Sequence, residues 1–377
     1  MTSGAAVEGR RRRMLILCPF PMGVAAGQRL KYEQYLDDWR EMGFDVDVSP
    51  YMDERLWNVA YSKGHYLAKA LGVLRGQARR LRDLFRVRGY DLVYVFMWVT
   101  PLGSSVMERL VRRLSRRLVY DIEDNVLVGQ ALSSADHPNP LTSLLKGRSK
   151  APYLICEADH VITSSPFLNE TCVAINRRGA CTYISSSIDT DRFLPANPYA
   201  GTQGLTIGWT GTHSTKMFLD LLRNVFQRLA TRVRFKLRVI GNFDYELPGV
   251  DLEVVRWTRE REVEDLQAID IGVYPLTLDD WVTGKSGLKA IQYMAFGLPA
   301  VATAVGTTPR IIRDGENGLL VRTEDEWLEA LERLIRDPDL RRRLGTAARA
   351  DAVAKYSLHA VAGQYRSVLR DALEAVR

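Results

Sequence analysis

The 377-residue chain lacks several features that assign a protein to a class at once. No apolar run approaches the roughly 18–20 residues of a membrane-spanning helix, so we expect a soluble globular protein. Its four cysteines show no CxxC spacing, which favours reduced thiols in a cytoplasmic protein. Its five histidines show no HxH or HxxxH spacing, so we expect no zinc site. The dinucleotide pattern GxGxxG, the P-loop pattern and the nucleophile elbow GxSxG are also absent, and the sequence predicts no cofactor of the nicotinamide class.

The N-terminus combines basic residues with a short apolar run, a pattern found both in signal peptides and before a first core strand. Arg10–Arg13 precede the apolar run Met14–Cys18, as in a signal peptide, but this run is short and is interrupted at Pro19 and Pro21. We interpret 14–18 as the first core strand, and residues 1–13 as a disordered basic N-terminus.

Positive charge is concentrated in the first third of the chain. The net charge is +7, and residues 1–125 hold 21 lysines and arginines against 15 aspartates and glutamates. Two helix-like stretches, 65–88 and 108–118, place arginines among leucines. Such helices suit peripheral contact with an anionic membrane, here the inner face, while a solvated charged face is the alternative. No aromatic stacking pattern or recognition motif accompanies the charge, so we expect no nucleic-acid partner.

Short apolar runs alternate with helical stretches over nearly the whole length, which is typical of parallel α/β sheets. Too many residues are present for one ordinary core, so two domains are expected. The predicted strands are 14–18, 46–49, 91–96, 118–122, 160–163, 181–184, 205–210, 236–240, 252–255, 271–274, 300–303 and 318–321. The main predicted helices are 29–42, 216–230, 260–268, 287–296, 323–337, 338–356 and 359–377.

The pattern predicts two Rossmann-like domains in tandem. We place the N-terminal domain at 14–190, a linker rich in Pro, Gly and Asn at 191–204, and the C-terminal domain at 205–356. A final helix over 357–377 is expected to cross back to the N-terminal domain. Ligands of such sheets bind beyond the carboxyl ends of the strands, and with two domains the expected site is the cleft between them.

Two strand-to-helix junctions of the second domain have the composition of phosphate-binding loops. Lys285-Ser286-Gly287-Leu288 opens directly into a helix, whose first N–H groups and partial positive charge suit a phosphate. The other junction follows the strand 205–210, and an ordinary capped turn is the alternative reading of each. Its glycine, hydroxyl and lysine residues are Gly211, Thr212, Ser214, Thr215 and Lys216.

Two further motifs follow predicted strands. Asp121, Glu123 and Asp124 lie at the end of a first-domain strand, where they could orient a sugar hydroxyl or bind a metal ion, unless they form a surface acidic turn. Arg256-Trp257 could pack against a nucleobase, although Trp257 is equally suited to core packing.

These residues resemble glycosyltransferase family 4, the retaining GT-B glycosyltransferases (glycosyl transferases group 1). The resemblance rests on 270–276, Lys285–Pro299, 301–306 and 314–321, and it is strongest over 205–356. The segments 207–215 and Tyr120–Asn125 resemble the phosphate-side loop and the acidic motif of one branch. The family's Glu-x7-Glu pair is replaced here, because Gly284 and Gln292 occupy those positions.

The resemblance implies a GT-B fold, two Rossmann-like domains with parallel sheets facing across a cleft, and specific site residues. Asp124 and Lys285 are the expected catalytic residues, and no metal is required. Gln28, Arg29, Asp121 and Glu123 are expected to line the acceptor side of the cleft. The expected donor-binding residues are Gly211, Thr212, Ser214, Thr215, Lys216, Arg256, Trp257, Lys285, Ser286, Gly287, Leu288 and Gln292.

The expected activity is transfer of a sugar, with retained configuration, from a nucleotide-diphosphate sugar to a glycan or lipid-linked acceptor in cell-surface polysaccharide or glycoconjugate synthesis. The stabilisation of diphosphate charge would be the main task of the protein. Two alternatives remain: another GT-B enzyme such as a nucleotide-sugar epimerase, and a non-catalytic partner subunit. We expect a cytoplasmic protein.

Overall fold

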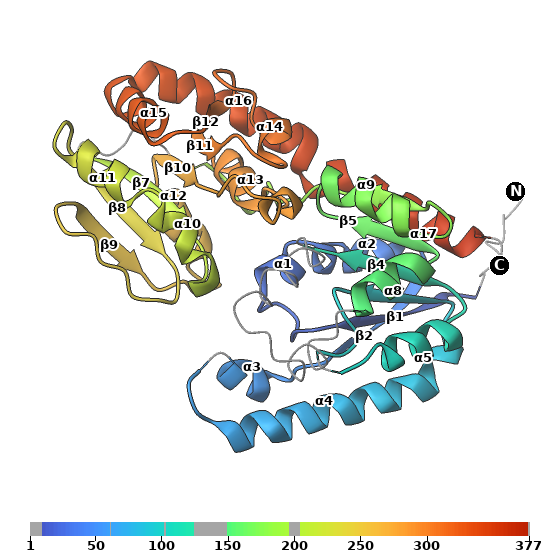
Figure 1. Cartoon of the computed structure of the whole chain (residues 1–377). Coiled ribbons are helices and arrows are strands. Elements are labelled where there is room, and N and C mark those ends of the chain that lie inside the picture. The colour runs from blue at the N-terminus through green and yellow to red at the C-terminus, as the bar shows by residue number, and fades with distance from the viewer. Residues whose placement is uncertain (1–9, 61, 102, 124–148, 196–203, 376–377) are drawn as a thin grey trace, which may run out of the picture. The chain divides into compact units, whose positions relative to one another are not determined.

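The computed structural model describes residues 10–60, 62–101, 103–123, 149–195 and 204–375, which form two parallel six-stranded sheets with helices (Figure 1). The contacts divide the chain into two units. Unit 1 comprises the residues up to Thr163, Asn169–Ile184 and the residues from Ala362 onward; unit 2 comprises Ser164–Leu168 and Ser185–Val361. The predicted fold class, an α/β protein of two Rossmann-like parallel sheets, is confirmed. None of the helices in these ranges has the length and apolarity needed to cross a bilayer.

The sheet of unit 1 has the strand order β2-β1-β3-β4-β5-β6. Met14–Cys18 and Leu92–Phe96, in two neighbouring strands, are continuous apolar runs, because helices cover both faces of a parallel sheet. Its strands are β1 (Arg12–Cys18), β2 (Phe44–Pro50), β3 (Leu92–Phe96), β4 (Leu118–Ile122), β5 (His160–Thr163) and β6 (Cys181–Tyr183).

Helices of unit 1 pack on both faces of this sheet. On one face, Trp39 of α2 contacts Tyr94 of β3 and Tyr365 of α17, with ring centroids 5.4 and 5.9 Å apart. On the other face lie α4 and α5 (Figure 1). The helices are α1 (Ala26–Arg29), α2 (Leu36–Glu41), α3 (Glu54–Ala60), α4 (Tyr66–Arg86), α5 (Val106–Leu114), α8 (Lys150–Glu157), α9 (Pro166–Ile175) and α17 (Leu358–Glu374), the last two shared with unit 2.

The sheet of unit 2 has the order β12-β11-β10-β7-β8-β9. Its strands are β7 (Leu205–Thr210), β8 (Phe235–Ile240), β9 (Asp251–Val255), β10 (Ile271–Tyr274), β11 (Ala300–Thr303) and β12 (Gly318–Val321). One apolar core joins β7, β8 and β10 to α11 and α15. The helices are α10 (Lys216–Asp220), α11 (Arg223–Ala230), α12 (Glu262–Gln267), α13 (Leu288–Ala295), α14 (Thr308–Ile311), α15 (Glu324–Arg336) and α16 (Pro338–Tyr356).

Two predicted helices are wrong as continuous elements. The stretch 29–42 is divided at Lys31, whose φ of −120° and ψ of −107° are not helical, into α1, a 3₁₀ turn at Tyr32–Tyr35 and α2. The stretch 216–230 is divided into α10 and α11 at Leu222, which is buried with φ −98° and ψ 4°. In both places the burial of particular side chains overrides the helical pattern of the sequence.

Each sheet contains a point where the strand order reverses. In unit 1, β1 pairs with both β2 and β3; in unit 2, β7 pairs with both β8 and β10. Ligands of open parallel sheets bind beyond the carboxyl ends of the strands at such a point. In unit 2, a ligand site is therefore expected at the segments that follow Thr210 of β7 and Tyr274 of β10.

Candidate functional site

The segment after β7 forms a loop lined with hydroxyl groups. The N–H of Thr212 donates to Thr215 Oγ1 at 3.0 Å, and the Thr212 and Ser214 hydroxyl oxygens are 2.9 Å apart. The first of these bonds is one half of a capping box between Thr212 and Thr215 around the 3₁₀ turn His213–Thr215, which leads into α10 at Lys216. All of the predicted hydroxyl residues therefore lie on one short turn at the end of β7.

Gly211 allows this turn to fold tightly over the sheet. A Cβ at this position would lie 2.2 Å from the Trp209 ring and 2.6 Å from Thr215 Oγ1, both too close for any side chain. The glycine N–H donates to Ile240 O of β8 at 3.0 Å. The loop backbone is consequently held close to the strand ends, where a ligand can approach it.

The segment after β10 ends at the N-terminus of α13. Gly287 precedes this helix with φ +75°, a left-handed conformation that glycine adopts without strain. A Cβ there would lie 2.2 Å from Ile311 Cδ1. Thr307 donates to Lys285 O at 2.7 Å, which fixes the chain just before the helix. The first N–H groups of α13 have no acceptor within the helix, so this end suits an anion.

Tyr293 connects the two segments. Its hydroxyl accepts a bond from Thr210 N at 3.3 Å and donates to Val273 O at 3.4 Å, so it bridges the ends of β7 and β10. Its ring lies over Gly272, where a Cβ would come within 2.3 Å. Residue 293 is therefore the structural reason that both loops open at one place.

Two lysines lie against aromatic rings beside these loops. Lys285 Nζ is 4.7 Å from the Trp281 ring centre, and Trp281 stacks on Phe218 of α10 at 5.6 Å. Lys289 Nζ is 4.6 Å from the ring centre of Trp209. Cation–π contacts of this kind hold a lysine in position while its charge is kept. The structure thus adds Lys289 and Trp281, which the sequence analysis did not assign.

The other predicted donor residues are placed differently. Ser286 and Gln292 are buried, the latter on the inner face of α13. Arg256 forms an ion pair with Asp244 at the surface, and Trp257 is half-buried. Both follow β9, two strands from β7 along the sheet. The structure therefore brings 211–216 and 285–288 together and leaves Arg256 and Trp257 toward the edge of the sheet.

In unit 1, Gln28 is an interior residue that organises its own loop. It is 1% exposed; its amide donates to Phe20 O at 2.9 Å and to Glu33 Oε1 at 2.6 Å, and its Oε1 accepts from Phe20 N at 3.3 Å. The neighbouring Arg29 is also buried. These partners hold the chain between β1 and α1 in place.

Asp121 lies in the interior of unit 1. It is fully buried, forms an ion pair with Lys31 and accepts a hydrogen bond from Tyr94. Burial raises the pKa of Asp121, while Lys31 and Tyr94 act in the opposite direction. Its carboxylate therefore neutralises a buried lysine, which accounts for an acidic residue at this position of a core strand.

The other two acidic residues differ from Asp121. The Glu123 carboxylate lies over the backbone of Gly27 in α1, since a Cβ on that glycine would be 2.3 Å from Glu123 Oε2. Asp124, the expected catalytic carboxylate, lies outside the described residues. Within the described ranges, no three His, Cys, Asp or Glu side chains gather closely enough to hold a metal ion.

The geometry of unit 2 agrees with comparisons to known proteins. Residues 204–337 match the family model described as glycosyl transferases group 1. The chain is 26% identical over 342 residues to the D-inositol 3-phosphate glycosyltransferase of Saccharomonospora viridis, covering 81% of this chain and 74% of that one. With the enzyme of the same name from Corynebacterium aurimucosum it shares 36% identity over 131 residues, 33% of this chain and only 30% of that relative.

Solved structures of similar fold include both units. Sucrose-phosphate synthase from Thermosynechococcus elongatus superposes with a TM-score of 0.71 at 18% identity, covering 97% of this chain and 100% of that one. Anabaena HepE in complex with UDP-glucose gives 0.63 at 16% identity, covering 95% and 99%. The family match over 204–337, the relatives and the fold agree: the chain has a GT-B fold, and its second unit is similar to the group 1 glycosyl transferases.

Proposed function

We propose that this chain transfers a sugar from a nucleotide-diphosphate sugar to a hydroxyl group of a glycan or lipid-linked acceptor, with retention of configuration at the anomeric carbon and without a metal ion. The observation that carries the proposal is the paired loop at the β7–β10 reversal point, where a turn with three hydroxyls and the N-terminus of α13 open at one place. A diphosphate has two phosphoryl groups, and two such neighbouring loops suit both.

The negative charge that develops on the leaving diphosphate explains why a lysine and backbone N–H groups lie at these loops. As the bond between the anomeric carbon and the diphosphate oxygen breaks, negative charge grows on the diphosphate. We expect Lys285, held against Trp281, and the first N–H groups of α13 to stabilise that charge. The acceptor oxygen forms the new bond to the anomeric carbon, and its proton passes to the departing diphosphate. A nucleoside diphosphate leaves as an anion, so the departure step needs no acid from the protein.

The donor and acceptor are proposed by comparison. HepE was solved with UDP-glucose, which makes UDP-glucose the first donor to test. The relatives named D-inositol 3-phosphate glycosyltransferase make inositol phosphates the first soluble acceptors. Asp124 keeps its predicted role in positioning the donor sugar or acceptor. A role in cell-surface polysaccharide or glycoconjugate synthesis belongs to the same proposal.

Donor binding tests the phosphate assignment. We expect Lys285→Ala to weaken the affinity for UDP-glucose, or for the donor found by a thermal-shift screen, by about tenfold or more, because a charge-assisted contact is lost. Lys236→Ala is the matched control, since Lys236 is exposed at the start of β8, at the opposite end of the sheet. Calorimetric titration of the parent and both variants measures the effect. Equal affinities in all three would overturn the assignment.

Turnover distinguishes the proposed activity from its alternatives. Release of nucleoside diphosphate that depends on an acceptor supports a transferase. Conversion of the free nucleotide sugar without any acceptor would identify an epimerase. Donor binding with no turnover across a panel of acceptors would identify a non-catalytic subunit.

A further inference from the structure

Helix α4 is oriented in unit 1 by its small and charged residues. Gly72 and Gly76 face the interior, where a Cβ would lie 2.7 Å from Leu56 Cδ1 and 2.6 Å from the Tyr51 ring. Only glycine permits this approach of the helix to α3 and the end of β2. The side of α4 that carries these glycines must therefore be the side that faces the protein.

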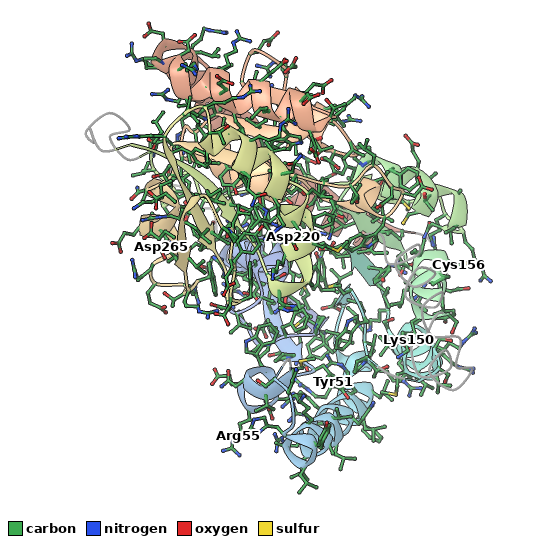
Figure 2. The ribbon with its side chains drawn as sticks, turned by 60° about the vertical axis from the view of Figure 1, so that its left-hand side comes forward. Tyr51, Arg55, Lys150, Cys156, Asp220 and Asp265 are labelled. Carbon is green, nitrogen blue, oxygen red and sulfur yellow. The ribbon has the colours of Figure 1, made fainter. Side chains whose placement is uncertain are left out.

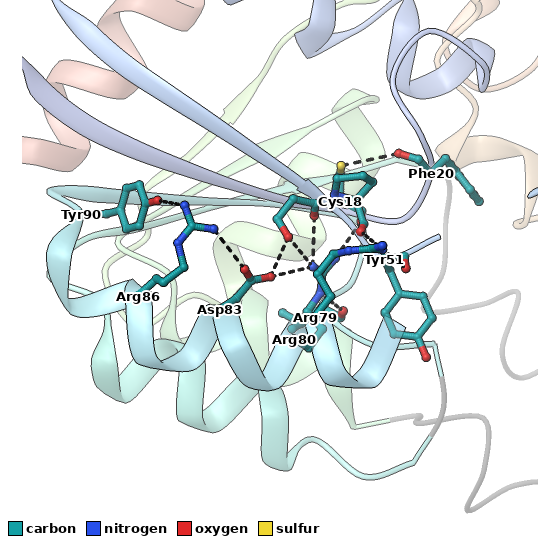
Figure 3. A network of polar contacts seen from close by, with 11 residues as sticks. Cys18, Phe20, Tyr51, Arg79, Arg80, Asp83, Arg86 and Tyr90 are labelled. Atoms are coloured by element: carbon teal, nitrogen blue, oxygen red, sulfur yellow. Dashed lines mark hydrogen bonds and ion pairs between the residues drawn. The ribbon is translucent and has the colours of Figure 1, made fainter. Parts of the chain in front are cut away.

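A buried arginine holds the same side of the helix (Figure 3). Arg80 is fully buried, pairs with Asp83 at 3.0 Å, and donates to the carbonyl oxygens of Val99 at 2.7 Å, Cys18 at 2.8 Å and Ser49 at 3.0 Å. Rotation of α4 about its axis would break the bonds to these three carbonyl oxygens, which belong to other segments, and would leave the guanidinium with Asp83 of its own helix as its partner. The orientation of the helix is thus determined by polar contacts, not by its leucines.

The consequence is a row of exposed apolar side chains on the opposite side of α4. The spacing of four and three residues places them on one helical stripe. The exposed fractions are high for such large apolar residues, and a contiguous patch of this kind marks an interaction surface. The row, called here the leucine face, comprises Leu67 (82% exposed), Leu71 (56%), Leu74 (64%), Leu81 (54%) and Phe85 (88%).

The charge around the leucine face indicates the kind of partner. Apart from buried Arg80, which pairs with Asp83, helix α4 carries five lysines and arginines. Arg75 and Arg82, both exposed, border the row on one side, and Arg75 also pairs with Asp53 at 2.8 Å. A second copy of the chain would bring the same arginines to this border, where like charges oppose pairing. Anionic lipid headgroups complement them, and the acyl region accepts leucine and phenylalanine.

We propose that the leucine face of α4 is a docking surface for an anionic lipid bilayer, with α4 lying in the plane of the interface. The apolar row enters the boundary between headgroups and acyl chains, and the bordering arginines contact lipid phosphates. The proposal concerns unit 1 and does not depend on the donor site, because lipid binding is measured without a nucleotide sugar.

Vesicle co-sedimentation of the full chain tests this docking surface. The parent is expected to bind vesicles of phosphatidylglycerol and phosphatidylcholine, and to bind phosphatidylcholine alone much more weakly. Leu71→Ser, Leu74→Ser and Phe85→Ser together should reduce binding to the anionic vesicles by about tenfold or more, because apolar burial is lost. Leu194→Ser with Val353→Ser, two exposed apolar positions of unit 2, is the control and should leave binding unchanged.

Two further measurements complete the test: vesicle binding by variants of reversed charge, and the oligomeric state of the protein in solution. Arg82→Glu should weaken binding to anionic vesicles, and Arg322→Glu, an exposed arginine of unit 2, should not. Failure of the parent to bind anionic vesicles, or equal binding by the triple serine variant, would overturn the proposal. A dimer in light scattering that the triple variant converts to a monomer, without lipid binding, would instead assign the face to self-association and also overturn it.

Discussion

Charged side chains are used differently in the two units. Unit 1 buries three pairs of opposite charge in its interior: Lys31 pairs with Asp121, Arg80 with Asp83, and Lys150 lies 3.6 Å from Glu108, with five of these six side chains no more than 5% exposed. In unit 2, pairs such as Arg228–Asp325 and Arg232–Glu332 lie at the surface. The carboxyl ends of β7 and β10 instead carry glycines, hydroxyls and lysines set on aromatic rings.

Lys150 illustrates what burial does to such groups in unit 1. Its ammonium donates to Thr100 O at 2.8 Å and to Thr100 Oγ1 at 2.7 Å, and Figure 2 marks its position together with Tyr51. Burial lowers the pKa of Lys150, and Glu108 opposes that shift. A buried charge of this kind contributes to the stability of the fold through its protein partners. The lysines of unit 2 that lie beside the two loops are positioned to contact a ligand.

Among the substitutions that test this difference between the units, Asp121→Ala is expected to have the largest effect on stability. Asp121→Ala leaves the buried Lys31 ammonium without its partner, and the free energy of unfolding should fall by about 3–5 kcal/mol. Asp325→Ala removes the partner of exposed Arg228 and should change stability little. Urea unfolding of both variants measures the difference. A small loss for Asp121→Ala would mean that Lys31 is solvated, contrary to its burial.

Gly287→Ala tests whether the unit 2 site depends on backbone shape. The added Cβ would collide with Ile311, so this variant should be less stable than Gly249→Ala by about 1–3 kcal/mol and should bind the donor more weakly. Gly249 is the matched control, since its φ is +84° and nothing lies within 4 Å of a Cβ there. Thermal unfolding and donor titration provide both values. Equal stability of the two variants would show that Ile311 moves aside without cost.

Tyr293→Phe removes the neutral bridge between β7 and β10. The free energy of unfolding should fall by about 1 kcal/mol, because Thr210 N and Val273 O lose a buried partner. Tyr66→Phe changes a residue that is 81% exposed and is the control. If donor affinity also falls in the first variant only, the bridge holds the two loops in register; a stability loss with unchanged affinity would limit its role to packing.

The smallest expected effect concerns the pH dependence of unit 1. Burial lowers the pKa of His160 below its ordinary value of 6.5, and its Nε2 lies 2.8 Å from Thr182 Oγ1. Below that pH the unfolded chain binds the proton more readily than the folded one, so stability should fall as the pH drops through 6.5. His160→Gln should flatten this decline, whereas His213→Gln, at an exposed position, should not. Unfolding between pH 7.5 and 5.5, a range of about two units around the ordinary pKa, measures the slopes.

Much of the fold was predictable because parallel strands covered on both faces are continuous apolar runs. Six predicted strands, among them Leu118–Ile122 and Leu205–Thr210, have the observed boundaries, and the others differ by one or two residues at one or both ends. The helices were less predictable. Lys31 and Leu222 interrupt helical patterns because of tertiary contacts that a local pattern does not contain.

The site was predictable to the extent that it consists of backbone and local sequence. The turn after β7 and the start of α13 follow from glycine, hydroxyl residues and a helix N-terminus at strand ends, so the sequence alone identified them. Lys289 and Trp281 were not identified, because their contacts with Trp209 and Phe218, both far away in the sequence, have no local signature.

Apolar strand patterns and loop composition are thus sufficient to predict the two parallel sheets and the segments that open at the β7–β10 reversal point. The folded structure establishes which charged residues are interior. It placed Asp121 against Lys31, and it placed Arg80 inside unit 1, which turns the leucine face of α4 outward. The physical reason is that a buried charge is tolerated only with its particular partners, and these partners come from distant strands.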